Sequence, residues 1–225
     1  MKWAAITGLE AEARIARRAG LPAKASGGVP AQTLAIAEAF LRAGAEALVS
    51  FGIAGALAPL LAPGRLLLPH AVIDDSGKLY PADVSWRADA MQALQRAGLM
   101  AEEGDVFGAA TAAASPARKA ELFHAKNAVA IDLESHIVGQ AAARSGKPFL
   151  VLRAIADTAA QALPEAAVNG LDRRGRPALG RVLLSVARRP GQIPALLRLA
   201  GDTRRALAAL DSALAAHPFR GSVAR

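Results

Sequence analysis

The chain has 225 residues, of which 53% are hydrophobic and none is cysteine. This length suits one α/β domain with a sizeable core, and the lack of cysteine excludes disulfides, thiol chemistry and the usual zinc ligands. The four histidines have no metal-ligand spacing, so no metal site is expected. No apolar run has membrane-spanning length and no signal-peptide pattern is present, which predicts a cytoplasmic location.

The net charge of +8 is concentrated at the C-terminal end. Residues 171–225 contain 11 arginines against 3 aspartates, whereas residues 1–170 hold 16 basic and 16 acidic residues and are neutral. A field of this kind suggests an anionic partner. Aromatic residues make up only 4%, too few for a base-stacking nucleic-acid surface, so peripheral contact with an anionic membrane is favoured over nucleic acid. The alternative is a solvated basic face that keeps the protein soluble.

Apolar periodicity and turn residues predict alternating strands and helices in the first half of the chain. The predicted elements are a strand over 3–7, helices over 9–19 and 32–43, a strand over 47–51, a strand over 65–73 and a hairpin turn at 74–77. The loop formed by Ser26, Gly27 and Gly28 could hold a phosphate on its backbone N–H groups, although so short a glycine segment favours an ordinary turn. Small residues at 52–56 would let a ligand approach the backbone closely.

The second half continues the alternation and ends in a basic helical part from about residue 177. The predicted elements are helices over 84–96 and from Ser115-Pro116 onward, a helix over 135–144, a buried strand over 149–155, a helix over 177–188, and one or two helices over 193–215. Leucines at 196, 199, 207, 210 and 214 form an apolar stripe. Such a stripe packs on its own domain or faces a membrane.

Two carboxylates follow or precede buried elements of the predicted sheet. Glu134 stands at a strand-to-helix junction, and Asp157 follows the strand over 149–155. In parallel α/β sheets such ends line the ligand crevice, so the two side chains are candidates for a shared site. The alternative is purely structural, with Glu134 capping a helix and Asp157 capping a turn.

Four junctions in this order resemble the nucleoside phosphorylase/nucleosidase superfamily. They are Gly8-Leu9-Glu10-Ala11-Glu12, Gly52-Ile53-Ala54-Gly55-Ala56, Gly104-Asp105-Val106-Phe107, and Ile131-Asp132-Leu133-Glu134 together with Arg153-Ala154-Ile155-Ala156-Asp157. The pattern is similar to that of 5′-methylthioadenosine/S-adenosylhomocysteine nucleosidases. The resemblance implies a single domain over residues 1–225 with a three-layer α/β/α fold around a mixed, barrel-like sheet. It also implies cleavage of a purine–ribose N-glycosidic bond without a metal or an organic cofactor. The resemblance further implies that the protein forms a homo-oligomer.

The resemblance also implies roles for individual residues. Asp157 matches the general acid that protonates the leaving purine, and Glu12 matches the residue that orients the attacking water. Glu134 matches the carboxylate that binds the ribose hydroxyls. Around them, the implied contacts with the nucleoside come from Ile53, Ala54, Phe107, Gly108, Leu133 and Ala156, with Phe107 stacking on the base and the Gly108 backbone bonding to its edge.

The sequence departs from the family pattern in ways that bear on the site. Ala156 stands where a serine usually precedes the acid, and Leu133 stands where a methionine is common. The tail Arg189-Pro190-Gly191-Gln192-Ile193-Pro194 resembles the hopanoid-associated phosphorylase branch. This branch implies a lipid-linked adenine nucleoside, adenosylhopane, with phosphate as a co-substrate, whereas Glu12 favours water.

Three functions are therefore open at the level of sequence. The first is cleavage of adenosylhopane by a protein at the inner membrane face. The second is a nucleosidase for methylthioadenosine or S-adenosylhomocysteine. The third, of another class, is a non-catalytic nucleoside-binding or membrane-peripheral protein, which Ala156 alone favours.

Overall fold

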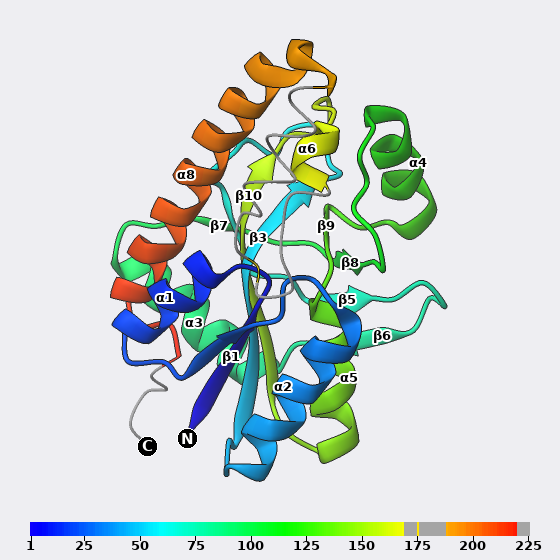
Figure 1. Ribbon diagram of the computed structural model, residues 1–225. Helices are drawn as coiled ribbons and strands as arrows, with labels where there is room; N and C mark the ends of the chain where they lie inside the picture. The colour runs from blue at the N-terminus through cyan, green and yellow to red at the C-terminus, as the bar shows by residue number, and fades with distance from the viewer. Residues whose placement is uncertain (169–174, 176–187, 220–225) are drawn as a thin grey trace.

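The computed structural model describes residues 1–168, 175 and 188–219. A mixed sheet forms its centre, and helices cover both faces (Figure 1). The strands are β1 (Trp3–Thr7), β2 (Ala23–Ala25), β3 (Ala47–Ala56), β4 (Leu66–Leu67), β5 (Ala71–Ile73), β6 (Leu79–Pro81), β7 (Ala101–Glu102), β8 (Val106–Gly108), β9 (Ala130–Asp132) and β10 (Phe149–Asp157). The helices are α1 (Glu10–Arg18), α2 (Pro30–Arg42), α3 (Val84–Arg96), α4 (Pro116–Lys126), α5 (Ser135–Ser145), α6 (Glu165–Val168), the 3₁₀ helix η1 (Pro190–Gln192) and α8 (Ile193–Ala215).

Strand β3 is the axis of the sheet because it pairs with three other strands. Its first half pairs in parallel with β1, its whole length pairs in parallel with β10, and its last two residues pair with β9 in antiparallel fashion. The first half of β3 therefore lies next to β1, whereas its last residues lie next to β9, and the sheet bends between these two parts. This geometry confirms the expected α/β fold with a mixed, barrel-like sheet.

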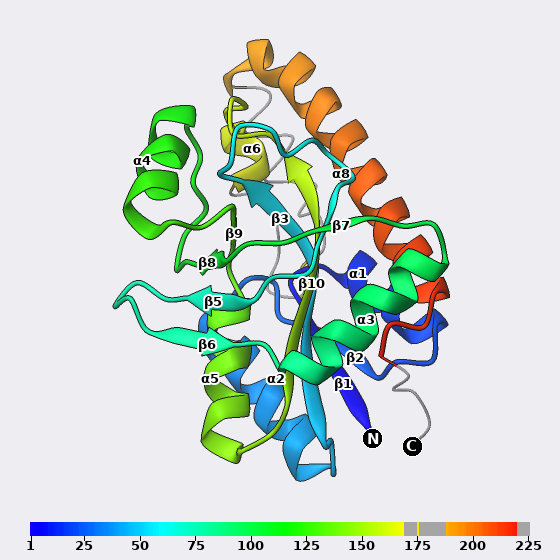
Figure 2. The same ribbon diagram turned by 180° about the vertical axis from the view of Figure 1, so that it is seen from behind.

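Helices on the two faces of the sheet bury separate cores. On one face α2 and α5 lie side by side, and on the other α1, α3 and α8 gather along β10 and β1, as opposite views show (Figures 1 and 2). Leu210 and Leu214 of α8 are buried against Trp3 and Leu152 in the second of these cores. No helix within the described residues is long and apolar enough to cross a membrane.

Several predicted elements agree with the structure, and the differences have physical causes. The strand predicted over 65–73 is wrong: β4 and β5 flank Pro69, which has no N–H to donate, and they pair with different partners, β10 and β8. Strand β10 extends to Asp157 because it pairs with β3 as far as Gly55, and β3 extends to Ala56 because it pairs there with β9. Residues 193–215 form the single helix α8. The helix predicted over 177–188 lies outside the described residues, apart from its final residue.

Candidate active site

A cavity of about 840 Å³ lies at the carboxyl ends of β3 and β10. Its wall also comes from the start of α1, the junction between β9 and α5, and helices α6 and α8. Candidate residues that line it are Glu12, Gly27, Gly28, Ile53, Ala54, Leu133, Glu134, Ala156 and Asp157. The structure therefore brings Glu134 and Asp157 to one shared cavity, together with Glu12.

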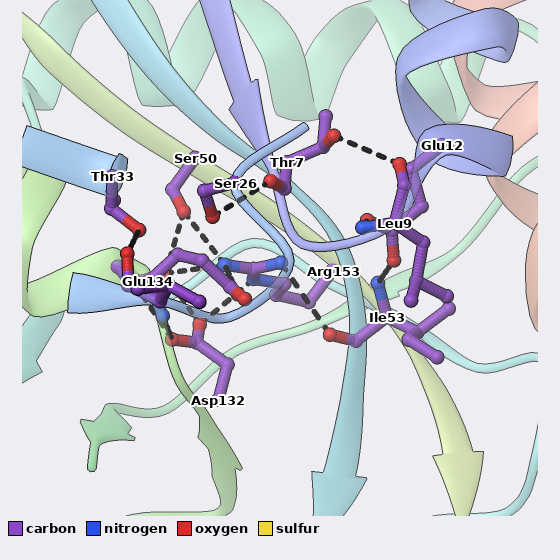
Figure 3. A network of polar contacts seen from close by, with 12 residues as sticks. Thr7, Leu9, Glu12, Ser26, Thr33, Ser50, Ile53, Asp132, Glu134 and Arg153 are labelled. Carbon is purple, nitrogen blue, oxygen red and sulfur yellow. Dashed lines mark hydrogen bonds and ion pairs between the residues drawn. The ribbon is translucent and has the colours of Figure 1, made fainter. Parts of the chain in front are cut away.

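Arg153 is the hub of the polar network beneath this cavity (Figure 3). Its side chain is fully buried, and its Nε lies 2.8 Å from Oδ2 of Asp132. Its Nη2 lies 3.3 Å from Oε2 of Glu134 and donates hydrogen bonds to the hydroxyls of Ser50 and Ser135, at 2.7 and 3.0 Å. A buried guanidinium needs such partners, because an unpaired charge in the interior is strongly unfavourable. Arg153 thus fixes the carboxylates at the end of β9.

Asp132 locks the turn that leads from β9 into α5. Its Oδ1 accepts the backbone N–H groups of Glu134 and Ser135 at 3.0 and 2.8 Å, and its Oδ2 accepts the hydroxyl of Ser135. Asp132 therefore caps the start of α5. The structural alternative for Glu134 fails, because its side chain makes no capping hydrogen bond. Glu134 is left to face the cavity.

Glu12 accepts hydrogen bonds from two backbone N–H groups, one at the N-cap of its own helix and one in β3. Oε2 accepts the N–H of Leu9 at 2.7 Å, and Oε1 accepts the N–H of Ile53 at 2.8 Å. Burial raises the pKa of Glu12, and the charge of Arg153 acts against this rise. The carboxylate joins α1 to β3, so its position at the cavity depends on both elements.

Glu134 is a buried carboxyl group whose protonated form is favoured. Burial raises the pKa of Glu134 to about 8, Arg153 opposes the rise, and the charges of Asp132 and Glu12 add to it. At neutral pH the group is therefore largely protonated and can both donate and accept a hydrogen bond. Such a group suits a pair of sugar hydroxyls.

A bulge in β10 directs Asp157 into the cavity. The pairing with β3 shifts register between Ile155 and Asp157, which leaves Ala156 as the extra residue. Bulges of this kind re-aim side chains beside active sites. As a result Ala156 and Asp157, although adjacent, both line the cavity. Burial raises the pKa of Asp157, and the ammonium group of Lys119 acts against the rise.

Glycines make room for the carboxylates. A Cβ atom on Gly52 would lie 2.7 Å from both Nη1 of Arg153 and the carboxyl carbon of Glu12. A Cβ atom on Gly8 would lie 2.6 Å from Oε1 of Glu134. Both distances are shorter than real Cβ contacts, so these positions exclude larger residues while the carboxylates stay in place.

Three predicted residues, Phe107, Gly108 and Ser26, lie outside the cavity wall. The ring of Phe107 is 1% exposed and packs with Leu57, Leu122 and Ile131. Stacking on a base would require this ring to leave its cluster. Gly108 lies in β8, where it pairs with Asp132 of β9 and its Cα faces the side chain of His136.

The proposed phosphate loop has largely used its donors. Ser26 is fully buried and lies outside the wall, and its N–H and hydroxyl both donate to the carbonyl of Thr7, at 2.8 and 3.1 Å. The N–H of Gly27 donates to the carbonyl of Gly8 at 2.9 Å. Because these bonds are internal to the protein, the loop offers a phosphate little beyond the N–H of Gly28.

Sequence reasoning missed Lys119 altogether and gave no role to Asp132 or Arg153. Lys119 lies in the charged helix α4 and is nevertheless fully buried at the cavity, where its Nζ contacts Asp157. Nothing in the pattern of α4 distinguishes this lysine from its exposed neighbours. Within the part of the chain that the structure describes, no group of three or more acidic, histidine or cysteine side chains could hold a metal ion.

Comparison with known proteins agrees with this architecture. The family model of the phosphorylase superfamily matches residues 13–188. The fold is similar to that of 5′-methylthioadenosine/S-adenosylhomocysteine nucleosidase from Helicobacter pylori in complex with a small molecule, with a TM-score of 0.70, 16% identity, and coverage of 96% of this chain and 98% of the other. No protein of curated function matches the sequence.

Two further solved structures have the same architecture. S-adenosylhomocysteine nucleosidase from Streptococcus pyogenes has a TM-score of 0.69 at 19% identity, covering 95% of this chain and 96% of the other. Futalosine hydrolase from Helicobacter pylori has a TM-score of 0.68 at 16% identity, covering 96% and 97%. Identities this low bear on the fold alone, whereas the family model spans most of the chain. The chain belongs to the phosphorylase superfamily of nucleoside phosphorylases and nucleosidases, which are enzymes that cleave N-glycosidic bonds.

Proposed function

We propose that this enzyme releases adenine from adenosylhopane, leaving a ribosyl or phosphoribosyl hopane for hopanoid biosynthesis. The observation that carries the proposal is the convergence of Glu12, Glu134 and Asp157 on one cavity. Cleavage of an N-glycosidic bond needs an acid on the side of the leaving base and a nucleophile on the other side of the sugar, as in glycoside hydrolysis. Three carboxyl groups from different elements can divide this work.

Asp157 is the general acid in this proposal. As the bond between ribose C1′ and the base breaks, its electron pair moves onto the purine, and N7 takes the proton from the Asp157 carboxyl group. Burial favours the protonated form of Asp157, because it raises the pKa of this group. A positioned acid contributes roughly 10²–10⁴-fold to a rate.

Glu134 and Glu12 act on the sugar and the nucleophile. Glu134 binds the ribose hydroxyls, and the contact with Arg153 at 3.3 Å holds it in position for this. Glu12 orients the nucleophile beneath the sugar. Ile53, Ala54, Leu133 and Ala156 present small or apolar surfaces to the nucleoside. Phe107 contacts the base only if its ring leaves its core cluster, and Gly108 lies outside the cavity wall.

Water is the nucleophile that the contacts of this site favour. In the loop formed by Ser26, Gly27 and Gly28, the N–H groups of the first two residues donate to backbone carbonyls. Arg153 is already paired with Asp132 and Glu134. Arg14 and Arg204 are exposed and also line the cavity, so a phosphate dianion would have to pair with these arginines of the wall rather than with this network. Dependence of the rate on phosphate concentration is the direct measurement, and a rate that requires phosphate would favour the phosphoribosyl product.

The apolar wall of the cavity supports a hydrophobic group on the ribose. Helices α6 and α8 and the loop before α6 line the site with Leu163, Ala166, Leu196, Leu199 and Leu207. Burial of apolar surface is favourable by about 25 cal/mol per Å², so such a wall retains an apolar 5′ substituent better than a polar one. A hopane tail is a large substituent of this kind.

A nucleosidase for methylthioadenosine or S-adenosylhomocysteine is the second candidate. The names of two similar structures favour it, because they are nucleosidases for these compounds. The buried, doubly bonded Glu12 is equally suited to water in that reaction. The third candidate, a non-catalytic nucleoside-binding or membrane-peripheral protein, is favoured only by the missing hydroxyl at Ala156.

One experiment separates these functions. The purified protein is incubated with adenosylhopane, methylthioadenosine and S-adenosylhomocysteine, each with and without phosphate, and free adenine is measured. We expect the highest kcat/KM for adenosylhopane. Faster turnover of the small nucleosides would favour the second candidate, and binding of adenine without any turnover would favour the third.

Membrane contact and self-association belong to the same proposal. An arginine near an anionic membrane surface contributes about 1 kcal/mol, and Arg198, Arg204 and Arg205 lie on the exposed part of α8. We expect co-sedimentation with vesicles that contain anionic lipid and not with neutral ones. Sedimentation velocity tests whether the protein is a homo-oligomer. A monomeric mass at the protein concentration used in the activity assay would contradict this expectation.

A further inference from the structure

Lys119 is a fully buried lysine with all of its hydrogen-bonding capacity used at the candidate site. Its Nζ donates hydrogen bonds to Oδ2 of Asp157 and to the carbonyls of Thr158 at 2.7 Å and Gln161 at 2.9 Å. An ammonium group has three donors, so this set satisfies it completely. Lysines are rarely buried in this way unless they are paired.

The pair joins elements that are far apart in the sequence. Lys119 comes from α4, whereas Asp157 ends β10, and the two carbonyls belong to the loop that follows β10. Residue 156, an alanine, has no hydroxyl to orient the acid, so among the described residues the hydrogen bond to the Asp157 carboxyl group comes from Lys119. Because this bond occupies Oδ2, the other oxygen, Oδ1, is the one available to a leaving base.

We propose that Lys119 is the positioning residue of this site, which holds Oδ2 of Asp157 and offsets the negative charge left on Asp157 when its proton passes to the base. This inference rests on the proposed function. In that step the bond between C1′ and the base breaks, the electron pair goes to the base, and the proton moves from Asp157 to N7. The product is a buried carboxylate, which is strongly unfavourable without a partner. The ammonium group of Lys119 is already in contact with it.

Other charges near the pair act in the opposite direction. Asp202 of α8 is buried, and its charge raises the pKa of Asp157. Asp202 itself pairs with Arg205, three residues further along the helix. Without Lys119, Asp157 would keep its proton more tightly and would be a poorer acid toward the base.

A purely structural role predicts a different result from a role in proton transfer. As a structural residue, Lys119 would only attach the loop at 158–161 to α4, and its loss would damage every reaction at the site equally. As a positioning residue, it matters only when the base must be protonated as it leaves. A nucleoside that is already methylated at N7 carries its positive charge in advance and needs no proton from Asp157.

The test compares Lys119→Met and Lys119→Arg with the native enzyme on two substrates. One is the adenine nucleoside that the native protein cleaves fastest among adenosine, methylthioadenosine and adenosylhopane, and the other is its N7-methylated cation. For Lys119→Met we expect kcat on the unmethylated nucleoside to fall roughly 10²-fold. We expect less than a fivefold change with the methylated one, on the order of 1 kcal/mol or below. Lys119→Arg restores part of the lost rate. The matched control is Arg118→Met, which removes an exposed ion pair with Glu121 from the same helix.

The outcomes distinguish this inference from the function on which it rests. If kcat of Lys119→Met falls equally on both substrates, or falls on neither, the positioning role is overturned and the proposed enzymatic function stands. If the native protein cleaves none of the adenine nucleosides, the proposed function is overturned and the inference fails with it. Circular dichroism and thermal unfolding identify a variant that fails to fold. If Lys119→Met does not fold, the ratio of kcat on the unmethylated nucleoside to kcat on the methylated one is measured for Lys119→Arg instead.

Discussion

Nη2 of Arg153 lies 3.3 Å from Oε2 of Glu134, and both side chains are buried, with Glu134 at the cavity wall and Arg153 behind it. The same guanidinium contacts Asp132 at 2.8 Å, so one cation holds two carboxyl groups. For Arg153→Met we expect the free energy of unfolding to fall by about 3–5 kcal/mol, because buried acidic groups lose their partner. Chemical denaturation measures this loss. Arg118→Met, which removes only an exposed ion pair, is the control and should cost below about 1 kcal/mol.

Gly52 is a position where the site leaves no room for a larger side chain. In Gly52→Ala the new Cβ atom would lie 2.7 Å from both Nη1 of Arg153 and the carboxyl carbon of Glu12, so one of them must move. We expect a loss of about 1–3 kcal/mol in stability and a larger loss in turnover. Gly201→Ala is the matched control, because Gly201 lies in α8 with open space around its Cα. That variant should keep native turnover, and equal damage in the two variants would contradict the argument.

The protonation of Glu134 predicts how stability depends on pH. The pKa of Glu134 is about 8 in the folded protein against 4.5 as its ordinary value, so the folded state holds more protons between these limits. The free energy of unfolding should therefore fall as the pH rises from about 5 to 8. In Glu134→Gln, which cannot titrate, the slope should be shallower by up to about 1 kcal/mol per pH unit. Denaturation at several pH values tests this, and an unchanged slope would refute it.

The wall formed by α8 predicts a change in substrate preference. Leu199 lines the cavity, whereas Leu197, on the same helix, is 70% exposed. In Leu199→Ser we expect kcat/KM for adenosylhopane to fall about tenfold or more, because apolar contacts with the tail are lost. The value for adenosine should change less than threefold. Leu197→Ser should leave both values near native, and parallel losses for the two substrates in Leu199→Ser would argue against a tail site along α8.

Local patterns in the sequence predicted those elements that depend on local signals. The helix over 84–96 has an amphipathic period, and the helix after Ser115-Pro116 begins with a cap and a proline, so both agree with the structure. The strand predicted over 65–73 failed because its division into β4 and β5 depends on two distant partners. Strand β3 continues through small residues that have little strand preference of their own, since β10 and β9 provide the pairing.

The sequence predicted those residues of the candidate site that belong to recognisable motifs, and it did not predict the others. Glu12, Glu134 and Asp157 stand at junctions that sequence can recognise, and they meet at the cavity. Lys119 could not be found because its burial follows from where α4 docks, and a lysine in a charged helix is usually exposed. Phe107 was expected to face the base, yet its side chain packs into the core between β8 and α4. The direction of a side chain in so short a strand depends on tertiary packing.

The most direct measurement is the turnover of Asp157→Asn on the adenine nucleoside that the native enzyme prefers. Asparagine keeps the shape of the side chain and cannot supply the proton, so kcat should fall by roughly 10²–10⁴-fold while adenine still binds. Isothermal titration with adenine measures the binding, and the release of free adenine measures the turnover. Native turnover in Asp157→Asn would contradict the role of Asp157 as the acid that lets the base leave.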